Sequence, residues 1–184
     1  MKSRLFIGIP VSTEIKENIL ALILQFKTIK AEFSIISPEN LHFTVKFLGD
    51  VEDVKIEEIK TILTKISQKQ NSFKIFLSKL GAFPSLEKIN VIWVGGSKEL
   101  LPLMKTANSS LSHIKESDYA EEVPHLTIAR VKSELNKEKL KEFIQKHQND
   151  TFGEMIVDKL VLYKSNLTPE GPVYEVIEEF KLNL

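Results

Sequence analysis

The chain alternates short apolar runs of β-strand character with longer segments whose apolar residues recur every three to four positions. The second pattern buries one face of a helix, and it predicts helices over 13–30, 54–69, 98–114 and 137–147. The apolar runs predict strands over 5–9, 33–36, 41–48, 73–80, 89–94, 125–130, 156–163 and 174–182. Both helices and tight turns connect these strands. The sequence therefore predicts an α+β or α/β class, and it favours mixed or antiparallel sheets with the helices outside.

Length and composition narrow the class further. A chain of 184 residues is expected to form a single domain, 1–184. Its 25 basic and 25 acidic residues give a formal charge of zero, which argues against a protein that coats nucleic acid through a strong basic field. The absence of cysteine excludes a disulfide framework, thiolate metal ligands and a thiol nucleophile.

Two further features concern location. The longest apolar run, 19–24, belongs to a predicted helix and is too short to cross a membrane. The N-terminal residues lead directly into a strand-like run and lack the apolar segment of a signal peptide. A cytoplasmic protein without membrane contact is therefore expected.

One short motif occurs twice. Segments 42–45 and 125–128 both contain histidine, an apolar residue, threonine and a second apolar residue. Alternate side chains of a strand share a face, so His42 projects beside Thr44. In the same way His125 projects beside Thr127, while the apolar residues between them point into the core. The chain has only four histidines, so two such pairs on strand-like runs favour a shared function over coincidence.

Two histidines and two threonines suit displacement at phosphorus. Imidazole titrates near neutral pH, so one ring can act as general base while the other acts as general acid. The threonine hydroxyls can donate hydrogen bonds to the nonbridging phosphate oxygens. The chain lacks the glycine-rich motifs of nucleoside triphosphate and dinucleotide sites, and no cofactor is expected.

Other interpretations of the histidines remain open at this point. A lone histidine on a sheet is commonly a half-buried residue with a structural hydrogen bond. Imidazole also binds metals, but two histidines alone do not fill a zinc shell, and neither motif carries a further histidine or cysteine beside it. The sequence therefore favours a site without metal.

The same residues resemble a known family. The two motifs, their spacing and the chain length resemble the two-histidine phosphoesterases, and more narrowly the LigT-like RNA 2′,3′-cyclic phosphodiesterases, historically called 2′-5′ RNA ligases. The resemblance includes the segments 4–9, 40–49, 125–131 and 164–174. It covers nearly the whole chain.

The resemblance implies a two-lobed α+β fold with pseudo-two-fold symmetry, in which each lobe contributes one motif to a central cleft. It implies hydrolysis of a terminal ribose 2′,3′-cyclic phosphate to a 2′-phosphomonoester. By the same resemblance, His42 is the general acid that protonates the departing 3′ oxygen, and His125 is the general base that activates water. Thr44 and Thr127 hold the phosphate oxygens. The sequence alone does not decide which histidine is the acid.

Residues beside the motifs are candidates for substrate binding. Arg130 faces away from His125 by strand alternation unless the strand ends or bulges, and a surface salt bridge is its alternative role. The resemblance favours contact with phosphate or RNA. Lys46 shares the alternation of His42 and adds positive charge to the cleft, or is a solvated lysine. Three phenylalanines offer base-stacking surfaces or belong to the core, namely Phe6, Phe43 and Phe47.

The expected partner is RNA that ends in a 2′,3′-cyclic phosphate, with transfer-RNA fragments and small cyclic nucleotides as candidate substrates. A monomer is expected. Two alternatives to hydrolysis remain. The same site joins strands when a 5′-hydroxyl replaces water and forms a 2′-5′ linkage, or the chain is a noncatalytic nucleotide- or RNA-binding module on the same scaffold.

Overall fold

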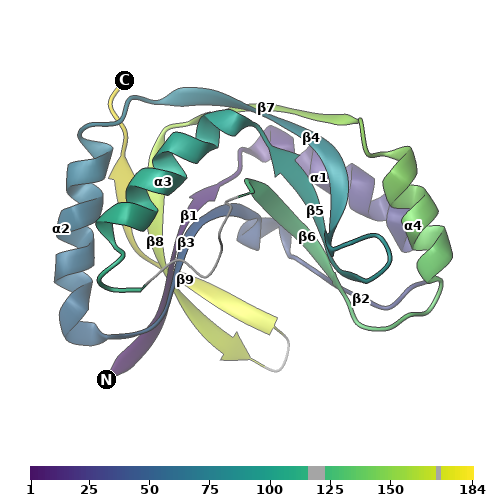
Figure 1. Ribbon diagram of the computed structural model, residues 1–184, viewed down its shortest axis with the longest axis horizontal. Coiled ribbons are helices and arrows are strands. Elements are labelled where there is room, and N and C mark those ends of the chain that lie inside the picture. The colour runs from purple at the N-terminus through teal and green to yellow at the C-terminus, as the bar shows by residue number, and fades with distance from the viewer. Residues whose placement is uncertain (116–122, 169–170) are drawn as a thin grey trace.

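The computed structural model describes residues 1–115, 123–168 and 171–184. Within these ranges the strands form one curled sheet, flanked by four helices (Figure 1). The strands are β1 (Lys2–Pro10), β2 (Phe33–Ile35), β3 (His42–Glu52), β4 (Phe73–Pro84), β5 (Ile89–Gly96), β6 (His125–Val131), β7 (Thr151–Val157), β8 (Lys159–Thr168) and β9 (Gly171–Lys181). The helices are α1 (Thr13–Lys27), α2 (Ile56–Ser67), α3 (Leu101–Ser110) and α4 (Lys137–Lys146).

The order of the strands is symmetric about the middle of the sheet. It runs β7-β4-β5-β6-β3-β1-β8-β9, and β2 pairs with β6 beside this path. Strands β6 and β3 lie at the centre, and each carries one copy of the histidine motif. Their neighbours, β5 and β1, precede them in the chain with a helix between. Pairing between the named strands is antiparallel throughout the described residues.

The helices cover the two halves of the sheet in pairs. Helix α1 packs against β7 and α4 against β4, whereas α3 packs against β3 and α2 against β8 and β9. Figure 1 shows α2 and α3 at one end of the molecule and α1 and α4 at the other. Helix α1 begins as expected, because the Ser12 hydroxyl accepts a hydrogen bond from the Ile15 amide at 3.3 Å.

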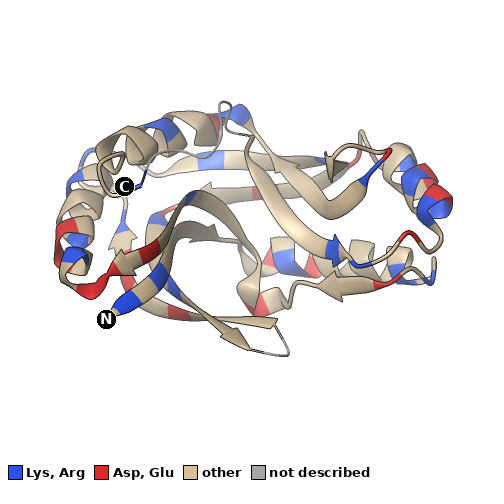
Figure 2. Cartoon of the chain, turned by 60° about the horizontal axis from the view of Figure 1, so that its bottom comes forward, with Lys and Arg blue, Asp and Glu red and all other residues tan. Residues whose placement is uncertain are grey.

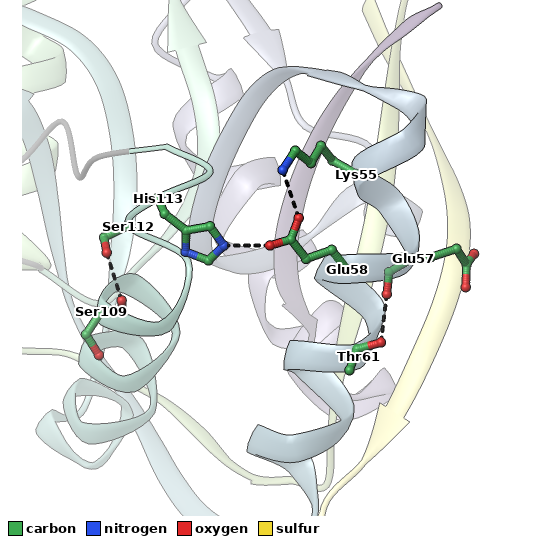
Figure 3. Close-up of polar contacts among 7 residues, drawn as sticks. All are labelled: Lys55, Glu57, Glu58, Thr61, Ser109, Ser112 and His113. Atoms are coloured by element: carbon green, nitrogen blue, oxygen red, sulfur yellow. Dashed lines mark hydrogen bonds and ion pairs between the residues drawn. The ribbon is translucent and has the colours of Figure 1, made fainter.

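A polar contact ties α2 to the end of α3. His113 Nε2 lies 2.9 Å from a carboxylate oxygen of Glu58, and Lys55 donates to the other oxygen at 3.0 Å (Figure 3). Hydrogen bonding from Lys55 and His113 lowers the pKa of the Glu58 carboxyl. The contact is exposed, so it contributes little to stability. No helix in the described ranges is long and apolar enough to span a membrane.

Several expected elements differ from those observed, and two of these differences concern the sheet beside the site. The predicted strand 156–163 is two strands, because β7 ends at Val157 and β8 begins at Lys159. The carbonyl of Asp158 between them instead accepts from the Leu182 amide at 2.7 Å. The strand predicted over 73–80 is longer than expected, because β4 continues as far as Pro84. There a Cβ on Gly81 would lie 2.3 Å from the Trp93 ring, so glycine permits the close packing of β4 on β5.

Candidate active site

The two motifs meet at the seam between β3 and β6. These strands share one paired position, at which Phe43 lies opposite Leu126. In an antiparallel pair this register places His42 opposite Thr127 and Thr44 opposite His125. The two histidines are then diagonal neighbours, with Cα atoms about 7–8 Å apart. Phe43 and Leu126 are buried. The four polar side chains therefore share the opposite face, and all four line one cavity.

Both imidazole rings are oriented by backbone carbonyls. Nδ1 of His42 lies 2.6 Å from the Asn40 carbonyl oxygen, and Nδ1 of His125 lies 2.7 Å from that of Val123. A carbonyl oxygen only accepts hydrogen bonds, so each Nδ1 carries a proton. Each Nε2 is therefore the atom that gains or loses a proton in chemistry. Nε2 of His42 also lies 3.1 Å from the Thr44 hydroxyl.

Burial sets the acid–base properties of the pair. Burial lowers the pKa of His42, the hydrogen bond to Asn40 opposes that shift, and the charge of His125 lowers the pKa further. Burial also lowers the pKa of His125, the hydrogen bond to Val123 opposes it, and Arg130 adds a further lowering. Both rings therefore stay neutral down to a lower pH than an unperturbed imidazole does.

A cavity of about 540 Å³ opens over the motifs. Its polar lining includes all four predicted motif residues and Arg130. The remaining lining is largely apolar. The full set is Ile36, Asn40, His42, Thr44, Val45, Lys46, Phe47, Phe83, Pro84, Val91, Met104, Asn108, Val123, His125, Thr127, Arg130 and Tyr174. A cavity of this kind, mostly apolar with a few convergent polar groups, is typical of a small-molecule or nucleotide site.

A β-bulge brings Arg130 into the cavity. On β5, Ile92 pairs with Ala129 and Trp93 with Thr127, so β6 contains one extra residue, Ile128, between these pairs. The extra residue reverses the alternation beyond it, and the arginine then faces the cavity beside His125. The sequence raised a bulge only as an exception to strand alternation. Periodicity alone could not locate it.

A second bulge changes the environment of Lys46. Gly8 pairs with Thr44 and Ile7 with Lys46, which leaves Val45 as an extra residue of β3. The expected alternation with His42 is therefore wrong. Lys46 is 4% exposed and turns toward α3, where its ammonium donates to the Asn108 side chain at 2.8 Å. It reaches the cavity wall from that side, together with Asn108, which the sequence had not indicated.

The three phenylalanines considered for base stacking differ in how far their side chains are exposed. Phe43 and Phe6 are each 2% exposed and belong to the interior, with the Phe6 ring 4.8 Å from that of His42. Phe47 is 50% exposed and lines the cavity. Two further aromatic residues at the site were missed from the sequence. Tyr174 lies edge-on to His42 at 5.3 Å, and Phe83 lies edge-on to His125 at 5.0 Å.

Gly8 makes the position of the His42 ring possible. A Cβ at this glycine would lie 3.1 Å from Cδ2 of His42 and 3.2 Å from the Tyr163 ring. Because β1 pairs directly with the motif strand β3, any larger side chain at this position would crowd the imidazole. A glycine inside an otherwise apolar strand is a sequence signal for such a close approach.

Fold and site together define a two-histidine phosphoesterase. The family described as LigT like Phosphoesterase matches residues 9–93 and 96–174, and each matched segment contains one motif. The chain belongs to this family. This confirms the family expected from the sequence, together with the α+β fold of two pseudo-symmetric lobes around a cleft.

Relatives extend over the full chain. A Methanocaldococcus jannaschii protein named RNA 2′,3′-cyclic phosphodiesterase is 42% identical over 178 residues, which is 96% of this chain and 99% of the relative. A Methanothermobacter thermautotrophicus protein of the same name is 33% identical over 187 residues, covering 99% of this chain and all of the relative.

Solved structures agree with the fold. A crystal structure of a Thermus thermophilus protein has a TM-score of 0.83 at 22% identity, covering 97% of both chains. The apo form of Escherichia coli LigT has a TM-score of 0.77 at 22% identity, covering all of this chain and 99% of LigT. At this identity the likeness concerns the fold. The roles of His42, His125, Thr44, Thr127 and Arg130 stay predictions.

Proposed function

We propose that this protein hydrolyses the terminal 2′,3′-cyclic phosphate of RNA to a 2′-phosphomonoester by two-histidine acid–base catalysis. The proposal depends above all on one observation. The two motifs place His42 and His125 as diagonal neighbours in one cavity, with both Nδ1 atoms held by carbonyls. The names of the relatives agree with this activity, which was also expected from the sequence.

The reaction assigns one proton to each ring. Nε2 of His125 removes a proton from water as the water oxygen attacks phosphorus. The bond from phosphorus to the 3′ oxygen breaks, and Nε2 of His42 donates its proton to that oxygen. The products are a ribose 3′-hydroxyl and a 2′-phosphomonoester. Thr44, Thr127 and Arg130 line the same cavity. In this proposal they donate hydrogen bonds to the nonbridging oxygens, whose negative charge grows in the transition state.

The electrostatics lower the pKa of both rings. Burial is the main cause in each case, and a nearby positive charge adds to it, from Arg130 at His125 and from His125 at His42. These directions do not rank the two rings. The assignment of His42 as the acid and His125 as the base therefore rests on the family resemblance.

The pH dependence should reflect the lowered pKa values. The active form needs one protonated and one neutral ring, and its population is largest between the two pKa values of the free enzyme. Both lie below the usual imidazole value of 6.5, so kcat/KM should have a maximum below about pH 6.5. Because the bound phosphate anion raises both pKa values, the maximum of kcat should lie at higher pH. A kcat/KM maximum above pH 7 would contradict this electrostatic description.

Product analysis tests the proposed reaction directly. A short RNA ending in 2′,3′-cyclic phosphate should yield the 2′-phosphomonoester at the same rate with and without excess EDTA. In the described ranges, no group of three or more metal-ligating side chains is present. Formation of the 3′-phosphomonoester, or loss of turnover in EDTA, would contradict the proposal. Adding a 5′-hydroxyl RNA measures 2′-5′ joining, and binding without turnover would indicate the noncatalytic alternative.

The partners follow from the same chemistry. RNA that ends in a cyclic phosphate is the proposed substrate, with transfer-RNA fragments and small cyclic nucleotides as candidates. The monomeric state and the cytoplasmic location expected from the sequence stay predictions.

A further inference from the structure

An arginine outside the motifs lies on the same face of the sheet as the catalytic site. Arg4, Phe6 and Gly8 alternate along β1 and therefore share a face. Phe6 contacts the His42 ring, and Gly8 lies beneath it. Arg4 is exposed, one alternate position beyond Phe6. Figure 2 shows basic residues on the strand that begins at the N-terminus.

The strand register brings Arg4 toward Tyr174 at the cavity rim. Leu5 pairs with Lys164, so continuing this register by one residue places Ser165 beside Arg4. Ser165 in turn pairs with Tyr174. Arg4 and Tyr174 are thus in one row across the sheet, two strand spacings or about 10 Å apart at their backbones, which their long side chains can span.

Electrostatics agree with this placement. Burial raises the pKa of the Tyr174 phenol, and the positive charges of Arg130 and Arg4 oppose that shift. Both guanidinium groups therefore act on the same phenol. Within the described residues, no carboxylate forms an ion pair with Arg4 or Arg130. Asp50 is the cross-strand partner of Arg4 on β3, but the side chains of the two residues form no ion pair.

We propose that Arg4 binds the phosphate on the 5′ side of the terminal nucleoside, beside Tyr174, and so selects RNA ends over nucleoside cyclic phosphates. This rests on the proposed function. In an RNA end the cyclic phosphate is separated from the next phosphate by a single ribose. With the cyclic phosphate between His42 and His125, the next anion lies toward the rim. A planar guanidinium there matches phosphate oxygens by two parallel hydrogen bonds.

The test compares two substrates that differ in that phosphate alone. Adenosine 2′,3′-cyclic phosphate lacks the 5′ phosphate, and its 5′-phosphorylated form carries it. The wild-type protein should show a kcat/KM about 10-fold higher on the phosphorylated form, chiefly through a lower KM, because a charged hydrogen-bonded contact is added. The ratio should fall as salt rises.

Variants then assign the preference to Arg4. Arg4→Gln should reduce the ratio of the two kcat/KM values to about 1, and Arg4→Lys should retain an intermediate ratio. Lys2→Gln is the matched control, because it removes an equal charge from the same strand and should keep the wild-type ratio. Thermal melting checks that each variant folds.

The outcomes separate this inference from the proposed function. Equal wild-type activity on both substrates overturns the role of Arg4 and leaves the hydrolytic function intact. The same holds if Arg4→Gln keeps the wild-type preference, or if Lys2→Gln loses it equally. No hydrolysis of either substrate by the wild-type protein would overturn the proposed function itself, and the subsite with it.

Discussion

Replacing His42 or His125 with alanine is expected to lower kcat/KM for the cyclic phosphate by about 10²–10⁴-fold. Each variant removes one of the two proton transfers and leaves the threonines and Arg130 in place. The double variant should lose much less than the product of the two single losses, because the rings act in the same step. Steady-state kinetics on an RNA ending in cyclic phosphate measure all three.

The control is a histidine outside the cavity. His113→Ala removes an exposed ring that contacts Glu58 between α3 and α2, and it should leave kcat/KM within about 2-fold of wild type. Circular dichroism would show whether the active-site variants keep their fold. Near wild-type turnover by a folded His42→Ala or His125→Ala variant would remove that residue from the mechanism.

Replacing Phe43 with alanine is expected to lower the free energy of unfolding by about 3–5 kcal/mol. The ring is 2% exposed, and it lies where β3 and β6 share their one paired position. Packing around it is tight, since a Cβ on Gly96 would lie 2.7 Å from Cε1 of Phe43. Denaturant unfolding, fitted with a common m-value, measures the loss.

A second phenylalanine on the same strand provides the comparison. Phe47 is 50% exposed, so Phe47→Ala should change the free energy of unfolding by less than about 1 kcal/mol. If the two variants lost similar free energies of unfolding, the packing of Phe43 between β3 and β6 would not stabilise the fold more than an exposed ring does. Because Phe47 lines the cavity, its replacement is expected to act on substrate binding instead.

Most of the secondary structure could be predicted because its signals are local. The apolar spacing of Ile15, Ile19 and Phe26 marks α1. The split between β7 and β8 was missed, although two adjacent charged residues, Asp158 and Lys159, interrupt the apolar run at this point. The end of β4 was missed because Gly81 resembles a break, although it permits contact with Trp93.

The residues of the cavity, too, could be predicted only in part from the sequence. His-x-Thr on a strand was sufficient to predict that each histidine projects beside its threonine. Tyr174 and Phe83 were not predicted, because aromatic residues on strands belong to the core more often than to a site. They line the cavity through the pairing of β9 with β8 and of β4 with β5, and these pairings join residues distant in the sequence.

The sequence by itself determined the mixed class, the two motifs and the family they resemble, because strand alternation and helical spacing are properties of neighbouring residues. Only the tertiary structure decided which residues reach the cavity from outside the motifs. A single extra residue in a strand reverses every side chain beyond it. The bulge at Ile128 thereby turns Arg130 into the cavity, and the bulge at Val45 turns Lys46 toward α3. Bulges form where two strands must match in register, and that match depends on residues far apart in the chain.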